Sequence, residues 1–534
     1  MKGLAIIVLF LSFGEQILAQ VNLTNSDLPI MIIETNGIIE DEPKVSGTMK
    51  LIYTPGQRNY IIDPPNEYNG DIGIEKRGST SQTVFPKTGF GFETRDEFGE
   101  NLNVSLLGMP EENDWVLHGP YSDKTLMRNA IAYTLAGQIM EYSPRVRHVE
   151  LILNGQYWGV YLLIEKIKRD KNRVDVKKNN DDITGGYIIK IDKYSGSEAG
   201  GWISQYAPLP GQNQFIEYQY HYPKESEINS NQAAYIESQF RKFENIMASD
   251  NFDDPIDGYK SVIDETTFMD FILVNEITKN PDAYRLSTFF YKNRDSIDHR
   301  IKMGPVWDFN LALGNVDYCV NGNPQGWAFD HNLVCPNDFW SIPFYWAKFR
   351  DDDTFNESIY DRWVELRADK YSDQSLISLV DSLKINLTES QARNFQRWPV
   401  LGQYVWPNYQ VFNSYTEEVN RLKSWLIDRA HWMDQNLPIF NSSGFNSEDQ
   451  YPPSIVQNPV RDILTLKFYA DNTKQTNLRI FNMVGKLVFE EKQAFIAGDQ
   501  ILDIDVQDLS QGMYILEFKI VGEDKGDAIK FTKF

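Results

Sequence analysis

The chain has only two cysteines among its 534 residues, Cys319 and Cys335. Two cysteines cannot support a disulfide-rich scaffold, and their spacing is not typical of a metal site or of a catalytic thiol. In an exported protein the pair is expected to close a disulfide, and two free thiols are the alternative. The fold must therefore rest on hydrophobic cores.

Basic residues are also fewer than acidic ones. The 52 basic residues are outnumbered by 75 acidic ones, which gives a formal net charge of −23. This balance argues against nonspecific binding to nucleic acid and to an anionic membrane surface. A nucleotide would be repelled as well, so nucleotide binding here requires a metal cation and particular Lys or Arg residues.

Long hydrophobic runs are missing after the first 20 residues. The apolar run from Leu4 to Phe13 follows Lys2, and the small residue Ala19 precedes Gln20. This pattern predicts a secretory signal peptide over residues 1–19. The run is too short to cross a membrane, and we expect no transmembrane segment in the mature chain.

The remaining composition is that of a globular protein, with 42% hydrophobic and 24% charged residues, and the length predicts two or three domains. Short strands and turns predict a β-rich lobe up to about residue 225. This lobe includes one helix over 124–140, capped by Ser122 and Asp123. Apolar residues at helical spacing then predict a helical lobe. Its expected helices span 231–248, 265–280, 373–383 and 414–436.

The last part of the chain has a different pattern. Residues 438–457 are rich in Ser, Asn, Gly and Pro, which predicts a linker. Short alternating strands with frequent turns follow over 458–534. They predict a small all-β sandwich of the immunoglobulin-like kind.

Two aspartates stand beside strand-like runs in the middle of the chain. Asp282 precedes the run 286–292, and Asp308 follows the run 301–307. Antiparallel pairing of these runs would bring both carboxylates to one end of a hairpin. Phosphoryl transfer from a magnesium nucleotide requires a catalytic carboxylate near a metal-binding one. Asp282 suits a general base, and Asp308 suits a Mg²⁺ ligand with Asn310 as a second oxygen donor.

Basic residues near small-residue turns are candidates for phosphate binding. Arg77 and Ser79 belong to a Gly- and Ser-rich turn, and Lys87 begins the next strand. Such a turn can offer backbone N–H groups to phosphate oxygens, although many turns of this composition are only turns. Lys124 and Arg128 are expected one turn apart on a helix face, where they either support the phosphate lysine or are simply solvated.

A third candidate is the apolar strand over 159–167. It contains Tyr161 and runs into Glu165 and Lys166. It is similar to the strand edge that lines an adenine pocket. A buried strand that ends at a charged loop is the alternative.

Longer blocks in this order resemble the CotH family of atypical, protein-kinase-like enzymes. The matching blocks include RGSTSQ, GGYIIKIDK, NPDAYRLSTFFYK and GPVWDFN, and the resemblance spans about residues 28–437. It implies an α+β fold with a two-lobed kinase-like domain. It also implies transfer of the ATP γ-phosphate to Ser or Thr of a secreted or surface protein, with Mg²⁺ or Mn²⁺.

The resemblance assigns roles by position. Asp282 matches the catalytic aspartate and Asp308 the metal-binding one, while Lys87 lies where a phosphate-contacting lysine is expected. Glu165 and Lys166 match the hinge-side block of the family, and the resemblance implies Tyr161 as an adenine-packing ring. Two positions depart from the kinase pattern. Ser287 stands where kinases often have a metal-binding asparagine, and Asn310 where many relatives have a second aspartate. Both residues are weaker metal ligands than those they replace.

The last 77 residues resemble the type A sorting domain of the type IX secretion system of Bacteroidetes. NPVRDILTL, NLRIFNMVGKLV and DLSQGMYILEF carry this match. It implies that the secretion machinery is a partner and that the protein crosses the outer membrane, to be released or attached at the cell surface.

The leading hypothesis is therefore a secreted CotH-type protein kinase. The alternative is a non-catalytic surface-binding protein, either a pseudokinase or a glycan binder. The aromatic content of 13%, the weakened metal site and the aromatic-rich insertion 323–340 favour that alternative. A glycoside hydrolase with two carboxylates is a third possibility, but it would leave the basic and Gly/Ser-rich clusters without a role.

Overall fold

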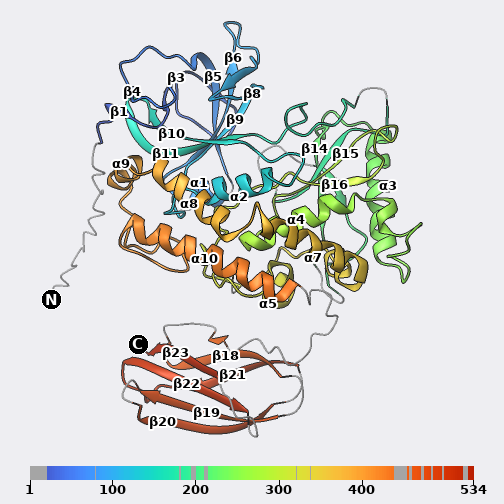
Figure 1. Ribbon diagram of the computed structural model, residues 1–534, viewed down its shortest axis with the longest axis vertical. Coiled ribbons are helices and arrows are strands. Elements are labelled where there is room, and N and C mark those ends of the chain that lie inside the picture. Colours follow the sequence, from blue (N-terminus) through green and yellow to red (C-terminus); the bar gives the residue numbers. More distant parts are fainter. Residues whose placement is uncertain are drawn as a thin grey trace, which may run out of the picture. The chain divides into compact units, whose positions relative to one another are not determined.

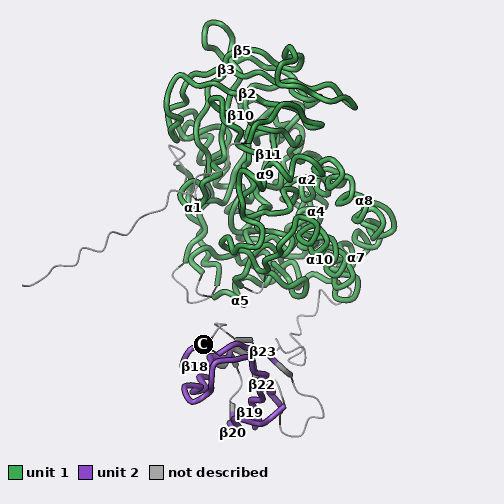
Figure 2. The backbone as a smooth tube through the Cα atoms, turned by 90° about the vertical axis from the view of Figure 1, so that its left-hand side faces the viewer, with its two compact units in different colours: residues 1–440 green, residues 441–534 purple. Residues whose placement is uncertain are grey.

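The computed structural model describes residues 21–78, 80–179, 182–193, 200–209, 214–319, 321–336, 338–437, 454–455, 460–470, 474–482, 485–495, 498–520 and 527–533. These fall into two compact units, Met1–Phe440 and Asn441–Phe534 (Figure 2). The predicted signal peptide, most of the predicted linker and Ser79 lie outside the described residues.

A closed barrel of seven strands forms the first part of unit 1. In barrel order the strands are β10 (Val146–Leu153), β11 (Gln156–Glu165), β9 (Asp114–His118), β6 (Gly89–Arg95), β5 (Tyr68–Arg77), β3 (Val45–Ile52) and β2 (Ile30–Thr35). Parallel pairing of β10 with β2 closes the barrel, and the other neighbours are antiparallel.

Alternation along each strand explains how the barrel is filled. Every strand contributes at least two apolar residues, two positions apart, to one buried cluster. These pairs are Met31/Ile33, Met49/Leu51, Ile72/Ile74, Phe90/Phe92, Trp115/Leu117, Val149/Leu151 and Tyr161/Leu163. Small sheets of two strands lie beside the barrel: β1 (Asn25–Ser26) with β4 (Asn59–Tyr60), and β7 (Val104–Leu106) with β8 (Met109–Glu112).

Strand β11 is apolar on both faces because it is covered on both. Tyr161 and Leu163 face the barrel interior, whereas Val160, Leu162 and Ile164 belong to the main core of the helical part. Helix α2 (Arg128–Gly137) packs in that main core. In Figure 1 the barrel strands (blue to cyan) lie on one side of α2, and helices α4 (Glu265–Thr278) and α10 (Tyr415–Asn436) lie on the other.

The start of α2 differs from the prediction. The helix begins at Arg128, not at Lys124, so Lys124 and Arg128 are not one turn apart on a helix. The Asp123 carboxylate accepts hydrogen bonds from the backbone amides of Thr125 and Arg128, and Leu126 has a φ of 62°. These local bonds form a turn in place of the first helical turn.

A second sheet follows the barrel, and all its neighbours are antiparallel. Its order is β13 (Gly201–Ile203), β14 (Glu217–Tyr222), β12 (Tyr187–Ile191), β15 (Thr288–Lys292) and β16 (Ile301–Met303). Phe290 pairs with Met303, so the predicted hairpin is confirmed. However, the sequence places β12 in the β-rich lobe, and in the structure it instead pairs with β15.

The helices of unit 1 include α3 (Ser230–Met247), α4 (Glu265–Thr278), α7 (Asp353–Ala368), α8 (Asp373–Asn386), α9 (Ser390–Arg397) and α10 (Tyr415–Asn436). They pack against both sheets and against one another: α4 against β16 of the second sheet, α9 against β11 of the barrel, and α8 against α10. Shorter helices are α1 (Thr80–Val84), α5 (His331–Val334) and α6 (Tyr345–Lys348). Capping boxes start α3 at Asn229 and α10 at Ser414. Helix α4 is buried on nearly all sides, so it is the central helix of unit 1.

Unit 2 is all-β, as predicted. One sheet contains β17 (Ser454–Ile455), β18 (Ile463–Ala470) and β21 (Gly498–Asp505). The other contains β20 (Leu487–Phe495), β19 (Lys474–Asn482), β22 (Gly512–Ile520) and β23 (Asp527–Lys533). Alternate apolar residues of both sheets, such as Leu464, Leu466, Leu478 and Ile480, share one core.

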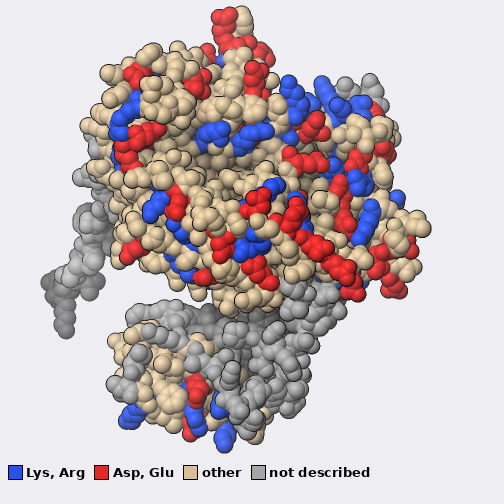
Figure 3. Space-filling view, in the orientation of Figure 1, with Lys and Arg blue, Asp and Glu red and all other residues tan. Residues whose placement is uncertain are grey.

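The chain is therefore an α+β protein. Its larger first unit contains helices and sheets, and its smaller second unit is a β domain. Within the described part of the chain, every helix is too short or too polar to span a lipid bilayer. Lys and Arg side chains are interspersed with Asp and Glu on the face drawn in Figure 3.

Candidate functional site

Asp282 and Asp308 are held close to each other by irregular backbone at the ends of α4 and β16. Helix α4 ends at Lys279, which has a left-handed φ of 42°, and the chain then turns through Asn280 into Asp282. The Asn280 side chain links the two aspartates. Its Oδ1 accepts a hydrogen bond from the Asp282 amide at 3.2 Å, and its Nδ2 donates to the Asp308 carbonyl at 3.4 Å.

Helix α2 also positions the Asp308 segment, because two of its side chains accept hydrogen bonds from backbone amides of that segment. Asp308 has a φ of 62°, a region that non-glycine residues seldom adopt. Its amide donates to the Tyr133 hydroxyl at 3.1 Å, and the next amide, of Phe309, donates to Asn129 Oδ1 at 2.7 Å. Because Asn129 and Tyr133 are four residues apart, they lie on one face of α2. Strained backbone held by several bonds is a frequent property of functional sites.

A third aspartate, Asp192, belongs to the same site and was missed from the sequence. It follows β12 directly, and the pairing of Ile191 with Thr288 places it next to Ser287. The Ser287 hydroxyl lies 3.4 Å from Asp192 Oδ2. The residue lies in the block GGYIIKIDK, but only the pairing of β12 with β15 brings it to the other two aspartates.

The charges of the three aspartates interact. Burial raises the pKa of Asp308 to about 7, and the nearby Asp282 and Asp192 carboxylates add to this effect. Lys193 and Arg77 act in the opposite direction. Burial, together with the Asp282 charge, also raises the pKa of Asp192 above its ordinary value, against the opposing effect of Lys190. The site therefore concentrates negative charge in a half-buried place, next to two cationic side chains.

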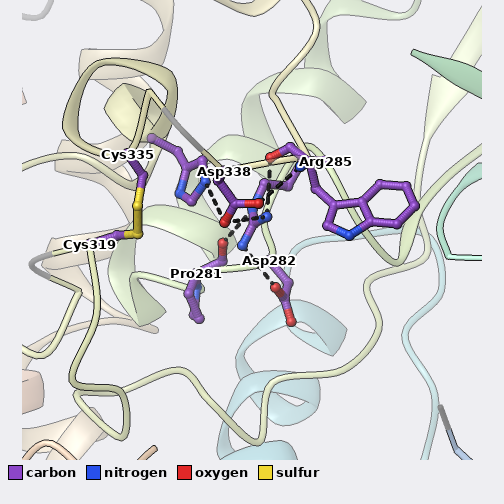
Figure 4. The surroundings of a disulfide bond; sticks show 8 residues. Pro281, Asp282, Arg285, Cys319, Cys335 and Asp338 are labelled. Carbon is purple, nitrogen blue, oxygen red and sulfur yellow. Dashed lines mark hydrogen bonds and ion pairs between the residues drawn. A yellow bond between two sulfur atoms is a disulfide. The ribbon is translucent and has the colours of Figure 1, made fainter. Parts of the chain in front are cut away.

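Arg285 orients the Asp282 carboxylate. Its Nη2 donates to Asp282 Oδ1 at 3.2 Å, and its Nε donates to the Pro281 carbonyl at 2.9 Å. On its other side, Nη1 lies 3.3 Å from Asp338 Oδ2 (Figure 4). Arg285 is buried, so Asp282 is held by a side chain that is itself fixed.

Three further residues that the sequence predicted for the site lie beside these aspartates. Arg77, at the end of β5, is close enough to Asp308 to lower its pKa. Ser287 contacts Asp192, as described above. Asn310 follows Asp308 by two residues, is half-buried, and its carbonyl accepts a bond from Asn315 Nδ2 at 2.9 Å. Ser79 lies outside the described residues.

Lys87 occupies a different place from the one predicted. Its side chain is 1% exposed, and its ammonium donates to the carbonyls of Pro120 and Val160 and to Asn394 Oδ1. Burial lowers the pKa of Lys87 well below its ordinary value. The three bonds tie the barrel to α9, so the structure gives Lys87 an internal structural role in place of phosphate contact.

Tyr161 and Glu165 are also interior residues. The Tyr161 ring packs inside the barrel, and its hydroxyl donates to the Thr88 carbonyl at 2.8 Å. Glu165 is fully buried and accepts bonds from the Arg145 side chain and amide and from Tyr142. Lys166 lies 3.7 Å from Asp114 at the rim of the barrel. These contacts favour the alternative of a buried strand that ends at charged residues.

Arg128 binds the backbone that follows Asp308. It forms an ion pair of 2.6 Å with Asp123, and it donates to the carbonyls of Ala312 and Leu313. Those carbonyls lie just after the Asp308 segment. Arg128 therefore positions this loop and is not placed as a phosphate ligand. Lys124 is likewise buried, and it binds the Gln403 carbonyl.

The two cysteines form a disulfide, with Cα atoms 5.5 Å apart. Of the two alternatives that the sequence left open, the disulfide is the one observed. It lies beside Asp338, whose carboxylate pairs with Arg285, and Arg285 in turn contacts Asp282 (Figure 4).

These features define a protein with an α+β domain that carries a half-buried aspartate cluster, followed by a small β domain. The family model described as CotH kinase protein matches residues 74–433, more than half of the chain, and the chain belongs to this family. A second model, described as a secretion system C-terminal sorting domain, matches residues 454–528. A comparison with curated proteins gives no match. The sorting domain indicates export, by secretion or to the cell surface, through the type IX secretion machinery.

Proposed function

We propose that this protein is a secreted protein kinase that transfers the γ-phosphate of ATP to Ser or Thr of a surface or secreted protein. The convergence of Asp282, Asp308 and Asp192 from three separate segments carries the proposal. The family match supports it, because the three residues lie inside the matched range. Mg²⁺, or Mn²⁺, is the cation that a set of carboxylate oxygens favours.

The residues have separate roles in this proposal. Asp308 and Asp192 would hold the cation, with oxygen donors from Ser287 and Asn310 beside them. Bound there, the cation would neutralise charge on the nucleotide phosphates. Arg77 and Lys193 supply positive charge next to Asp308. Asp282, oriented by Arg285, accepts the hydrogen bond of the acceptor hydroxyl.

The reaction forms a bond between the acceptor oxygen and the γ-phosphorus and breaks the bond from that phosphorus to the ADP oxygen. Asp282 takes the hydroxyl proton and returns it to solvent. In this proposal the barrel and the helical part correspond to the two lobes of a kinase-like domain. The β domain corresponds to an immunoglobulin-like sandwich, and the acceptor is met outside the cytoplasm or at the outer membrane.

Nucleotide titration with the full chain tests this function. ATP is expected to bind in the presence of Mg²⁺ and at least tenfold more weakly without it, because the aspartate cluster repels an uncompensated triphosphate. Asp308→Asn and Asp192→Asn should remove the Mg²⁺ dependence. Asp282→Asn should keep ATP binding and lose phosphate transfer, measured as autophosphorylation or as labelling of cell-surface proteins.

Asp253→Asn is the matched control, since this aspartate is exposed and lies in the segment between α3 and α4, at the opposite end of α4 from Asp282. If the three cluster variants bind ATP and transfer phosphate as the wild type does, the proposed function is wrong.

A non-catalytic glycan-binding protein is the second candidate, and an exposed aromatic surface favours it. Tyr404, Trp406 and Tyr409 are 57%, 43% and 45% exposed, and Trp406 stacks on Tyr318 with centroids 6.4 Å apart. Exposed rings can stack on sugar faces. A thermal shift with polysaccharides, and none with ATP and Mg²⁺, would favour this candidate over the kinase.

A further inference from the structure

We propose that Cys319, His331, Cys335 and Asp338 form a Zn²⁺ site when the Cys319–Cys335 disulfide is reduced. One ligand atom from each of these four side chains lies within 4.8 Å of all the others. The spacing in the sequence did not predict a metal site, because Cys319 is separated from the other three residues. The tertiary structure brings them together.

The backbone arranges three of the ligands locally. The Cys335 amide donates to the His331 carbonyl at 2.8 Å, and the Asp338 amide donates to the Cys335 carbonyl at 3.0 Å. Residues separated by four and by three positions are thus held in successive turns, with their side chains near one another. Cys319 comes from the loop that follows Asp308 and supplies the fourth ligand.

His331 provides an independent observation. Its side chain is 2% exposed, and its Nδ1 makes no hydrogen bond to the described residues. Its Nε2 has one long contact, with Asp338 Oδ2 at 3.5 Å, and Asp338 is itself a member of the cluster. This distance is longer than that of a normal hydrogen bond, so the buried imidazole is poorly satisfied. Coordination of a metal by one ring nitrogen and by Asp338 would replace this weak contact.

The chemistry of the donors selects the ion. Two thiolates, one imidazole and one carboxylate are ligands that Zn²⁺ accepts in tetrahedral geometry, at about 2.3 Å for sulfur and about 2.0–2.2 Å for nitrogen and oxygen. Mg²⁺ and Ca²⁺ prefer oxygen ligands only. The ion of this site therefore differs from the one proposed at Asp308.

The disulfide and the zinc site exclude each other, since a disulfide sulfur carries no thiolate charge. A dithiol reductant opens the disulfide by exchange. The dithiol is oxidised to a disulfide, and Cys319 and Cys335 are each reduced to a thiol. On binding Zn²⁺, both thiols release their protons to solvent.

The site also shares Asp338 with Arg285, the residue that orients Asp282 (Figure 4). Zinc bound to Asp338 would compete for the carboxylate that now pairs with Arg285. Reduction and zinc would therefore alter the support of Asp282. This last consequence rests on the proposed kinase function, whereas the metal site does not.

Zinc binding by the full chain tests the inference. The protein is reduced with a phosphine under anaerobic conditions, equilibrated with Zn²⁺, freed of excess metal, and its zinc content measured. About one tightly held zinc per chain is expected after reduction and none in the oxidised protein. With Co²⁺ in place of Zn²⁺, the reduced protein should show a thiolate-to-cobalt charge-transfer band and the visible bands of a tetrahedral ion.

His331→Ala should weaken zinc binding by at least tenfold, whereas His299→Ala, at an exposed histidine, should leave it unchanged. The cobalt spectrum of the wild type keeps the test independent of any folding defect in the variant. A reduced wild type that retains no zinc, or a cobalt spectrum without the charge-transfer band, would overturn the proposal. Nucleotide binding by the oxidised protein tests the kinase function separately.

Discussion

At the scale of single residues, burial separates the side chains that can reach a ligand from those that support the fold. Lys87 and Arg128 are candidates from the sequence because of their charge, but both are enclosed and bonded to protein groups. Asp308 and Asp282 are candidates because of their position after strand and helix, and both lie in the aspartate cluster. Charge alone does not tell a ligand-binding lysine from a structural one.

Lys87→Met tests this distinction. The substitution should lower the free energy of unfolding by about 2–4 kcal/mol, because the Val160 carbonyl and Asn394 lose a buried donor. Nucleotide affinity of the folded variant should stay within about twofold of the wild type, as expected for a residue that contacts no ligand. Urea unfolding and ATP titration measure the two quantities. If Lys87→Met is as stable as the wild type but no longer binds ATP, Lys87 contacts phosphate as the sequence predicted.

At the scale of elements, one buried ion pair joins the central helix α4 to α10. Arg429 Nη2 lies 2.9 Å from Glu276 Oε2, and both side chains are fully buried. Glu276 also accepts bonds from the amides of Ala328 and Phe329, and Arg429 donates to the carbonyls of Pro324 and Gly326. The pair therefore fixes the insertion 323–340 that carries His331 and Cys335.

Arg429→Met should destabilise unit 1 by about 3–5 kcal/mol, because it leaves the Glu276 charge buried and unpaired. The double variant Glu276→Leu with Arg429→Met should recover part of this loss. Arg241→Met removes a half-exposed ion pair with Glu237 and serves as the control, with an expected loss below about 1 kcal/mol. Equal losses in Arg429→Met and Arg241→Met, measured by urea unfolding, would contradict the role given to the buried pair.

A second prediction concerns acid stability where β9 meets the end of β11. Burial by itself would raise the pKa of Asp114, but Lys166 and Lys168 outweigh it and lower the pKa to about 2. Because the folded pKa lies below the ordinary value of 3.8, the unfolded state binds the proton more readily. The stabilisation is complete above about pH 4 and is lost as the pH falls through about 2.

Asp114→Asn should therefore lose about 2.5 kcal/mol of stability at pH 7, and the difference from the wild type should shrink between about pH 4 and pH 2. Chemical unfolding at a series of pH values measures it. Glu111→Gln, at an exposed carboxylate nearby, should show no such dependence. A difference that stays constant with pH would show that the charge of Asp114 does not matter.

At the scale of the whole molecule, each unit has its own core. Among the described residues, the clusters of the barrel and helical part draw only on unit 1, and the cluster of the β domain only on residues 460–531. Residues 21–440 should therefore fold without the tail, with the circular dichroism of a folded α+β protein. Without the sorting domain, the protein should not cross the outer membrane.

A reporter fusion is the sharper test of the tail. A reporter that carries residues 1–20 at its start and 441–534 at its end should reach the medium or the cell surface. The same reporter with residues 1–20 alone should remain inside the outer membrane. If both reporters are found in the same place, the tail does not direct export.

The sequence by itself determined the order of the elements, the all-β tail, and the hairpin that carries Asp308, because these depend on local periodicity and turn residues. Only the tertiary structure decided that β12 joins β15, and so that Asp192 meets Asp282 and Asp308. It also decided that Lys87 is internal and that His331 faces the cysteines. The contact of Asp192 with Ser287 joins residues about 100 positions apart, and the contact of Lys87 with Asn394 joins residues about 300 positions apart. The partners in such contacts are set by core packing, which leaves no local pattern in the sequence.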